Sequence, residues 1–309
     1  MRGRVDVHHH IFPPEYVSSM PPEILRVPKD PWSVEQALEV MGQNNIEFAA
    51  TSVSTEVTLP NRGATAKVAR QSNDYGAKLR HDKPESFGLL ATLPLPYMDE
   101  ALKEVGYAFD ELGADGVALM TNYQGKYLGD PELEPLLQEL DRRNAVAFVH
   151  PTTCECPTCH PKVNISLLEF PFDTTRTITS LFFSGALYKY PNIKFIFSHG
   201  GGTVSHLAYR IAMVTKTNPA MAYPGAPDIW TALKGLYYDV VTAVAPSMMR
   251  SLLEVAPLDH VLFGTDYPFI PAWRVALMIE QFGESGLSAE DIEKIGFDNA
   301  RPLFPRLQR

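Results

Sequence analysis

Asp6-Val7-His8-His9-His10-Ile11-Phe12, near the start of the chain, predicts a β-strand that ends in a cluster of histidines. Side chains along a strand alternate between its two faces, so His8 and His10 share one face and His9 lies on the other. Two imidazoles placed in this way can bind one divalent cation at ~2.0–2.1 Å each. Three adjacent histidines are equally compatible with a solvated patch, so the metal interpretation requires further ligands at the ends of other strands.

Further β-rich segments follow the first, and stretches with helical or mixed patterns separate them. The predicted strands are Arg4–His8, Ile46–Ser54, Ser86–Thr92, Asp115–Thr121, Ala145–His150, Lys194–His199, Leu236–Val241 and His260–Thr265. Several are almost continuously apolar, as strands buried on both faces are. Strand–helix alternation repeated in this way along 309 residues predicts an α/β fold, a parallel (β/α)8 TIM barrel. A doubly wound open sheet is the alternative, and it is disfavoured because no Gly-x-Gly-x-x-Gly turn follows the first strand.

Three helical patterns between the strands have recognisable ends. Ser33–Asn44 begins with a serine N-cap, Pro131–Arg143 has proline at its first helical position, and Thr174–Tyr190 stops before a proline. No linker or change of composition divides the chain, so residues 1–309 are expected to form a single domain. The last helical pattern, Ser288–Pro305, is expected as a C-terminal helical appendage to the barrel.

The composition is that of an ordinary globular protein, with 45% apolar and 20% charged residues. A net charge of −9 and a pI near 5.5 argue against nucleic acid or an anionic membrane as a partner. No apolar run reaches the ~18 residues of a membrane span, and the first residues lack the apolar segment of a signal peptide. A reduced, cytoplasmic protein is therefore expected.

The ends of the predicted strands carry the residue types of a metal centre. In (β/α)8 barrels the chemistry takes place at the C-terminal ends of the strands. Besides His8 and His10, these ends carry His150, His199 and Asp266. Each histidine alone would be more typical of a structural residue. Four imidazoles and a carboxylate at one end of a barrel favour a bound divalent metal ion.

These strand-end motifs resemble those of the amidohydrolase superfamily. The motifs are Asp6-x-His8-x-His10, His150-Pro151, His199-Gly200-Gly201-Gly202 and Gly264-Thr265-Asp266-Tyr267-Pro268. More narrowly they resemble its decarboxylase branch, which includes the α-amino-β-carboxymuconate-ε-semialdehyde and 6-methylsalicylate decarboxylases, and the resemblance extends over nearly the whole chain. It implies a catalytic histidine, His199, beside one metal ion whose ligands would be His8, His10, His150 and Asp266.

The resemblance also implies an assembly and a class of substrate. Arg210, eleven residues after His199, matches an arginine that in this branch binds carboxylate in the neighbouring subunit's active site, which implies a homodimer. Pro28–Ala37 has no arginine to match a second carboxylate-binding arginine of the semialdehyde enzymes, which favours a monocarboxylate such as a salicylate. Asp115–Thr121 lacks the lysine that bridges two metals in binuclear members, so a single metal is implied. His8 stands where gamma-resorcylate-type decarboxylases have a glutamate.

The implied activity is metal-dependent, non-oxidative decarboxylation of a small ortho-hydroxy aromatic acid, with 6-methylsalicylate giving 3-methylphenol and CO2. Direct loss of CO2 would leave a carbanion in the ring plane, so the carbon bearing the carboxylate must be protonated first, and Asp266 is the candidate to deliver that proton. His199 either orients water or the substrate carboxylate and stabilises charge, or deprotonates a metal-bound water. Zn²⁺ suits three imidazoles and one carboxylate, and Mn²⁺ would suit a substrate that adds two oxygen ligands.

Two rival functions use the same residues. A mononuclear metal-dependent hydrolase of a lactone or amide would use the metal and His199 to activate water. A metal-binding protein without turnover would not need His199 or proton transfer by Asp266, and these extra groups disfavour it.

Two loops and three aromatic residues have open interpretations. Cys154-Glu155-Cys156-Pro157-Thr158-Cys159-His160 could hold a second, structural zinc or contain only free thiols, and the missing second Cys-x-x-Cys pair favours free thiols. Ile11–Trp32 is a long, proline-rich loop placed to cover the metal. Phe12, Phe269 and Trp230 could pack on an aromatic substrate or belong to the core.

Overall fold

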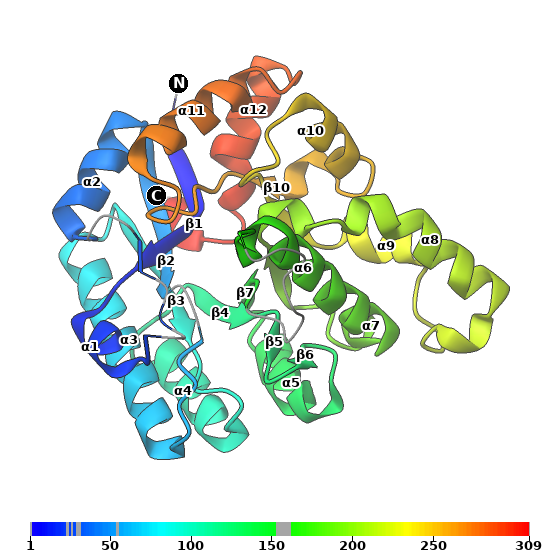
Figure 1. Cartoon of the computed structure of the whole chain (residues 1–309), viewed down its shortest axis with the longest axis horizontal. Helices are drawn as coiled ribbons and strands as arrows, with labels where there is room; N and C mark the ends of the chain where they lie inside the picture. Colours follow the sequence, from blue (N-terminus) through cyan, green and yellow to red (C-terminus); the bar gives the residue numbers. More distant parts are fainter. Residues whose placement is uncertain are drawn as a thin grey trace.

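Eight parallel strands form the central sheet of the computed structural model, which describes residues 2–22, 25, 27–28, 32–53, 56–152 and 162–308 (Figure 1). The sheet order is β1 (Arg4–Ile11), β2 (Ile46–Val53), β3 (Phe87–Thr92), β4 (Gly116–Met120), β7 (Val146–His150), β8 (Lys194–Phe197), β9 (Tyr237–Asp239) and β10 (Val261–Leu262). Every ladder between neighbours is parallel. Each strand lies within or overlaps a segment that the sequence predicted, and the (β/α)8 barrel is confirmed.

The barrel closes between β1 and the segment that follows β10. Three backbone N–H groups donate across this seam, from Val7 to Phe263, from Asp266 to His8 and from His10 to Tyr267. The buried carboxylate of Asp6 reinforces it, because its Oδ1 accepts the N–H of Thr265 at 2.9 Å. Hydrogen bonds at the seam therefore fix Asp266 beside the histidines of β1.

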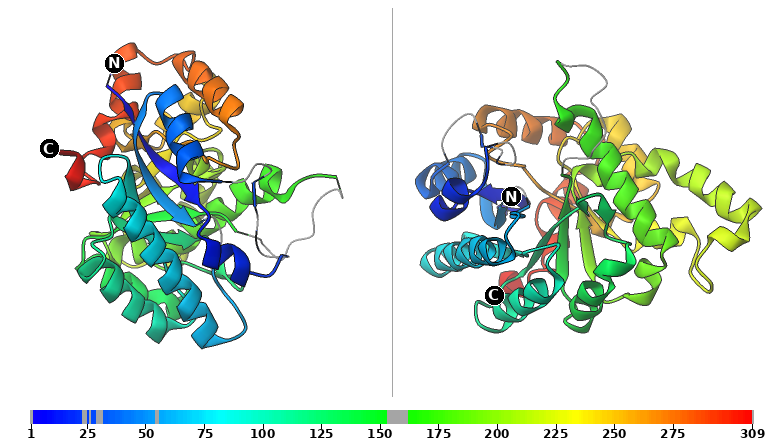
Figure 2. Two further views of the ribbon diagram at one scale, coloured as in Figure 1. Left: turned by 90° about the vertical axis from the view of Figure 1, so that its left-hand side faces the viewer. Right: turned by 60° about the horizontal axis from the view of Figure 1, so that its bottom comes forward.

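Helices surround the strands, as Figures 1 and 2 show. Those between successive strands include α2 (Val34–Gln43), α3 (Arg62–Asp82), α4 (Met98–Asp110), α5 (Glu134–Arg142), α6 (Ile165–Phe183), α8 (Val204–Thr217) and α10 (Pro246–Leu253). Smaller elements are α1 (Pro14–Ser19), α7 (Ala186–Lys189), α9 (Ile229–Lys234) and the hairpin β5 (Asn122–Tyr123) to β6 (Lys126–Tyr127). After β10 come α11 (Ala272–Gly283) and α12 (Ala289–Gly296). Among the described residues, no helix combines the length and apolarity that a bilayer crossing requires.

Two of the predicted helices keep their predicted ends, and the third is divided in two, although its second part, α7, stops before a proline as predicted. Ser33 caps α2, since its hydroxyl accepts the N–H of Gln36 at 3.2 Å. Pro131 opens a short 3-10 turn that leads into α5. The predicted helix Thr174–Tyr190 instead begins at Ile165, contains a proline in its first half, and stops where Gly185 takes a left-handed φ of 76°. Only glycine adopts that conformation readily, so α6 and α7 are separate helices.

The C-terminal segment is part of the core rather than an appendage. After α12 the chain turns under the barrel, and Ala300, Leu303 and Phe304 pack against residues from the barrel interior such as Val5 and Phe48. Phe304 is fully buried. In the left view of Figure 2 both termini lie on the side of the barrel opposite α1. The segment therefore closes the N-terminal end of the barrel and leaves the C-terminal ends of the strands for chemistry.

Candidate metal centre

The strand β1 supplies two of the predicted ligands from one face. It continues to Ile11, three residues beyond the predicted end, so His8 and His10 lie within the strand and are completely buried. His9 points away from them, and its Nδ1 lies 3.1 Å from the carboxylate of Asp6. The alternation of side chains in a strand thus separates His9 from the other two histidines.

The structure brings His8, His10, His150 and Asp266 together, with one potential ligand atom from each lying within 4.8 Å of all the others. The Nε2 atoms of His8 and His10 are 3.1 Å apart. Oδ1 of Asp266 lies 3.3 Å from Nε2 of His8 and 3.2 Å from Nε2 of His10. These atoms belong to β1, to the end of β7 and to the segment after β10, which the barrel places at one end.

The hydrogen bonds around this cluster suit a metal ion. Nδ1–H of His8 donates to Asp239 at 2.8 Å, and Nδ1–H of His150 donates to the carbonyl of Pro151 at 2.8 Å. Each bond places the ring proton on Nδ1, so both Nε2 atoms present a lone pair. Oδ1 of Asp266 is buried without a hydrogen bond to any described residue. Lone pairs that converge in this way repel one another unless a cation lies between them, so the residues fit a divalent metal.

The charges of the cluster also attract a cation. Burial alone would lower the pKa of His8, but the carboxylates of Asp266 and Asp239 outweigh it and raise that pKa to about 10. Burial lowers the pKa of His10 and lowers that of His150 further. Burial would raise the pKa of Asp266, but the positive charge of His8 and the close approach of the histidine rings hold it well below its ordinary value. A divalent ion would therefore compete with a proton for this cluster.

His199 stands beside the cluster without joining it. It begins the short 3-10 turn that follows β8, and its Nε2 lies 3.6 Å from Oδ2 of Asp266. Its backbone takes a left-handed φ of 55°, which non-glycine residues adopt where the surroundings hold them. The backbone N–H of His199 donates to Asp239 at 2.8 Å, and Nδ1 lies 3.1 Å from Oγ of Ser198. Nε2 is thus free to exchange a proton with Asp266 or with a bound molecule.

Aromatic side chains flank the histidines. The ring of Phe269 lies 5.6 Å from that of His10, and Phe12 lies 5.8 Å from Phe269. On another side the ring of Phe170, from α6, lies 5.9 Å from that of His150. Phe12 and Phe269 were predicted, but Phe170 was missed, because nothing in a helical segment distinguishes an aromatic residue that faces the site.

Trp230 and Arg210 occupy other positions. Trp230 is a partly buried residue of α9 that packs against the main core. Arg210 lies on the exposed side of α8, whose buried residues include Ala208 and Ile211. Its guanidinium makes no hydrogen bond or ion pair with any described residue of the chain.

Asp239 is the second residue that the sequence reasoning missed. It ends β9 and is fully buried. An acidic residue inside an otherwise apolar strand was the available signal, because a buried charge requires partners.

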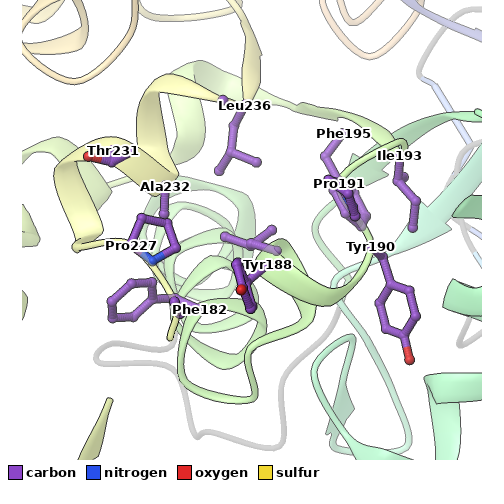
Figure 3. A pocket seen from close by; sticks show the side chains of 13 residues that line it. Phe182, Tyr188, Tyr190, Pro191, Ile193, Phe195, Pro227, Thr231, Ala232 and Leu236 are labelled. Carbon is purple, nitrogen blue, oxygen red and sulfur yellow. The ribbon is translucent and has the colours of Figure 1, made fainter. Parts of the chain in front are cut away.

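The cavity in Figure 3 is not part of this site. It has a volume of about 210 Å³, and its walls include Pro191 and Ile193 before β8 and Gly235 and Leu236 before β9. Residues that precede strands lie at the opposite end of the barrel from the cluster. The predicted cysteine motif, Cys154 to His160, lies outside the described residues.

Known proteins are similar to this chain over nearly its full length. The amidohydrolase family model matches residues 5–306. Decarboxylase yanB of Aspergillus niger is 33% identical, over 99% of this chain and 88% of that protein. The 6-methylsalicylic acid decarboxylase of Penicillium expansum is 32% identical, over 99% of this chain and 97% of that protein. The crystal structure of an amidohydrolase II superposes with a TM-score of 0.91 at 30% identity, covering 98% of this chain and 100% of that one. This chain therefore belongs to the amidohydrolase family and, within it, to the decarboxylase branch.

Proposed function

We propose that this protein is a metal-dependent decarboxylase of small aromatic acids that carry a hydroxyl group ortho to the carboxylate, and that 6-methylsalicylate is its substrate. The products would be 3-methylphenol and CO2. The proposal rests on the cluster of His8, His10, His150 and Asp266 with His199 beside it, and on full-length similarity to a 6-methylsalicylic acid decarboxylase.

The chemistry explains why a proton donor must face the ring. Cleavage of the bond to the carboxylate before protonation would leave an electron pair in the ring plane, where the π system cannot stabilise it. If that carbon is protonated first, the ring loses its aromaticity. An ortho oxygen lowers the energy of this non-aromatic intermediate, because the oxygen takes ketone character. Departure of CO2 then restores the aromatic ring.

Each residue of the site has a role in this sequence. A bound divalent metal would supply Lewis acidity and a fixed point for the substrate's oxygens. Asp266 would carry the proton to the ring carbon, and its low pKa means that it must first take that proton, from the substrate's hydroxyl or from His199. His199 would orient the substrate carboxylate and stabilise the charge of the reacting groups. Phe12, Phe269 and Phe170 would pack on the faces of the ring.

The metal and the substrate's charge follow from the residues present. Three imidazoles and one carboxylate are a usual set for Zn²⁺, and Mn²⁺ would gain from two additional substrate oxygens. We therefore propose a single Zn²⁺ or Mn²⁺ ion. The absence of arginine from Pro28–Ala37 supports a substrate with one carboxylate.

Moving the hydroxyl group should abolish turnover. We expect CO2 release from ortho-hydroxybenzoates such as 6-methylsalicylate, and none from the meta and para isomers or from the ortho methyl ether, since none of these can place an ionised oxygen beside the carboxylate. Headspace CO2 and the phenolic product would be measured with metal-loaded protein. Equal rates for ortho and meta isomers would contradict the mechanism, and hydrolysis of lactones or amides without CO2 release would identify a hydrolase instead.

Arg210 should act across a dimer interface. Arg210→Ala and His199→Ala proteins should each be inactive, but mixing them should restore up to about a quarter of the sites, because half of randomly paired dimers are hybrids with one intact site each. The exposed position of Arg210 on α8 supports this arrangement. Activity would be measured after dissociation and reassociation of the mixed subunits. A fully active monomer in solution would contradict the proposal.

A further inference from the structure

Asp239 is a buried carboxylate that contacts both parts of the site. Its Oδ2 accepts the Nδ1–H of His8 at 2.8 Å. Its Oδ1 accepts two backbone N–H groups, from His199 at 2.8 Å and from Val241 at 3.0 Å. One side chain at the end of β9 thus holds a metal-cluster histidine through one oxygen and the catalytic histidine through the other.

We propose that Asp239 is a positioning residue that determines which nitrogen of His8 faces the metal and fixes the place of His199 beside it. The inference rests on the metal site of the proposed function. It goes beyond the four proposed metal ligands, because it names a further residue on whose hydrogen bonds the site depends.

Asp239 fixes the position of the proton on the ring of His8. A carboxylate only accepts hydrogen bonds, so a ring nitrogen 2.8 Å from it must carry the proton. With the proton on Nδ1, the Nε2 atom of His8 keeps its lone pair toward His10 and Asp266. The negative charge of Asp239 also makes the ring a stronger electron donor to a metal.

Asp239 also holds the backbone at His199. The residue has a left-handed φ of 55°, and Gly200 after it has a φ of 62°. A non-glycine residue keeps this conformation only where other contacts hold it. The bond from its N–H to Oδ1 of Asp239 is such a contact, and it sets the distance of His199 from Asp266.

An asparagine of the same shape cannot replace this carboxylate in either orientation. If its oxygen faces the backbone N–H groups of His199 and Val241, its amide NH2 faces His8 and forces the ring proton onto Nε2, where it blocks the metal. If its oxygen faces His8, the NH2 opposes two backbone N–H donors and the turn at His199 loses its support. In either orientation, asparagine therefore loses either the correct protonation of His8 or the support of the turn at His199.

The decisive experiment measures Zn²⁺ affinity of the metal-free, full-length protein by competition with a chromophoric chelator. Asp239→Asn should bind Zn²⁺ about 10–100-fold more weakly than the wild type. Glu104→Gln is the control. Glu104 is also a buried carboxylate, but it accepts its hydrogen bonds from Asn73 and Arg70, which are not residues of the metal site. It should keep the wild-type affinity.

The outcomes separate this inference from the proposed function. Equal affinity in Asp239→Asn and wild type, or an equal loss in Glu104→Gln, would overturn the role of Asp239 alone. A wild type that binds no divalent metal would overturn the proposed function and this inference with it.

A second measurement needs no Asp239 variant and stands even if that variant does not fold. In the Zn²⁺-loaded wild type, nitrogen-15 NMR of labelled histidines should find the proton of His8 on Nδ1, with the signal assigned by its loss in His8→Gln. A proton on Nε2 of His8 would overturn the proposal.

Discussion

Replacing Asp266 by asparagine should lower the rate of decarboxylation by about 10²–10⁴-fold, the usual contribution of a group that transfers a proton in the rate-limiting step. The amide keeps an oxygen that can face His8 and His10, which lie 3.3 and 3.2 Å from Oδ1 of the carboxylate. It cannot accept and release a proton as the carboxylate does. The loss of rate should therefore exceed any loss of metal.

Two measurements test this expectation. Elemental analysis gives the metal content by which the rates of wild type and Asp266→Asn are normalised. Turnover by the wild type in D2O should place one deuterium on the ring carbon that lost CO2. An Asp266→Asn protein that is fully metallated and decarboxylates at the wild-type rate would remove Asp266 as the proton carrier, although the metal site would remain.

The double replacement of His8 and His10 by alanine should eliminate metal and activity together. It removes both imidazoles of β1 and leaves only His150 and Asp266 of the cluster. Two ligands are too few to hold a divalent ion against water and buffer. Addition of Zn²⁺ should raise the melting temperature of the wild type, since a ligand that binds only the folded state stabilises it, but should leave that of the variant unchanged.

His9→Ala is the matched control for that variant. His9 lies between the two replaced residues and is as buried as they are, yet it faces Asp6 rather than the cluster. Its replacement should leave the metal content near that of the wild type. Full metal occupancy in the double variant would refute the ligand assignment.

The strands and the histidine cluster were predictable because the physical signals are local. A run such as Val146 to Val149 is apolar at every position, as a strand covered on both faces must be, and the histidine after it stands at the catalytic end. Repetition of this pattern around a barrel then places distant strand ends together. For the same reason Asp266 was assigned to the cluster although most of the chain separates it from His8.

The features that were missed depend on contacts between distant segments. Nothing near Asp239 in the sequence reveals that its two oxygens face His8 and His199. Phe170 belongs to a helix only because α6 begins at Ile165, before the predicted start at Thr174, and it faces His150 from there. Phe304 fills the N-terminal end of the barrel because the chain turns back after α12. The pattern of a short amphipathic helix does not predict that the chain turns back after it.

The seam of the barrel has a consequence for biosynthesis. It joins Asp6 to Thr265, which are 259 positions apart, and it is the same seam that sets Asp266 beside β1. A ribosome releases the N-terminal part of a chain first, so His8 and His10 emerge while Asp266 has not yet been made. Of the four proposed ligands, a nascent chain therefore holds only the three histidines until Asp266 has been added. If the proposed site binds a metal ion, all four ligands come together only in molecules whose first and last strands have met.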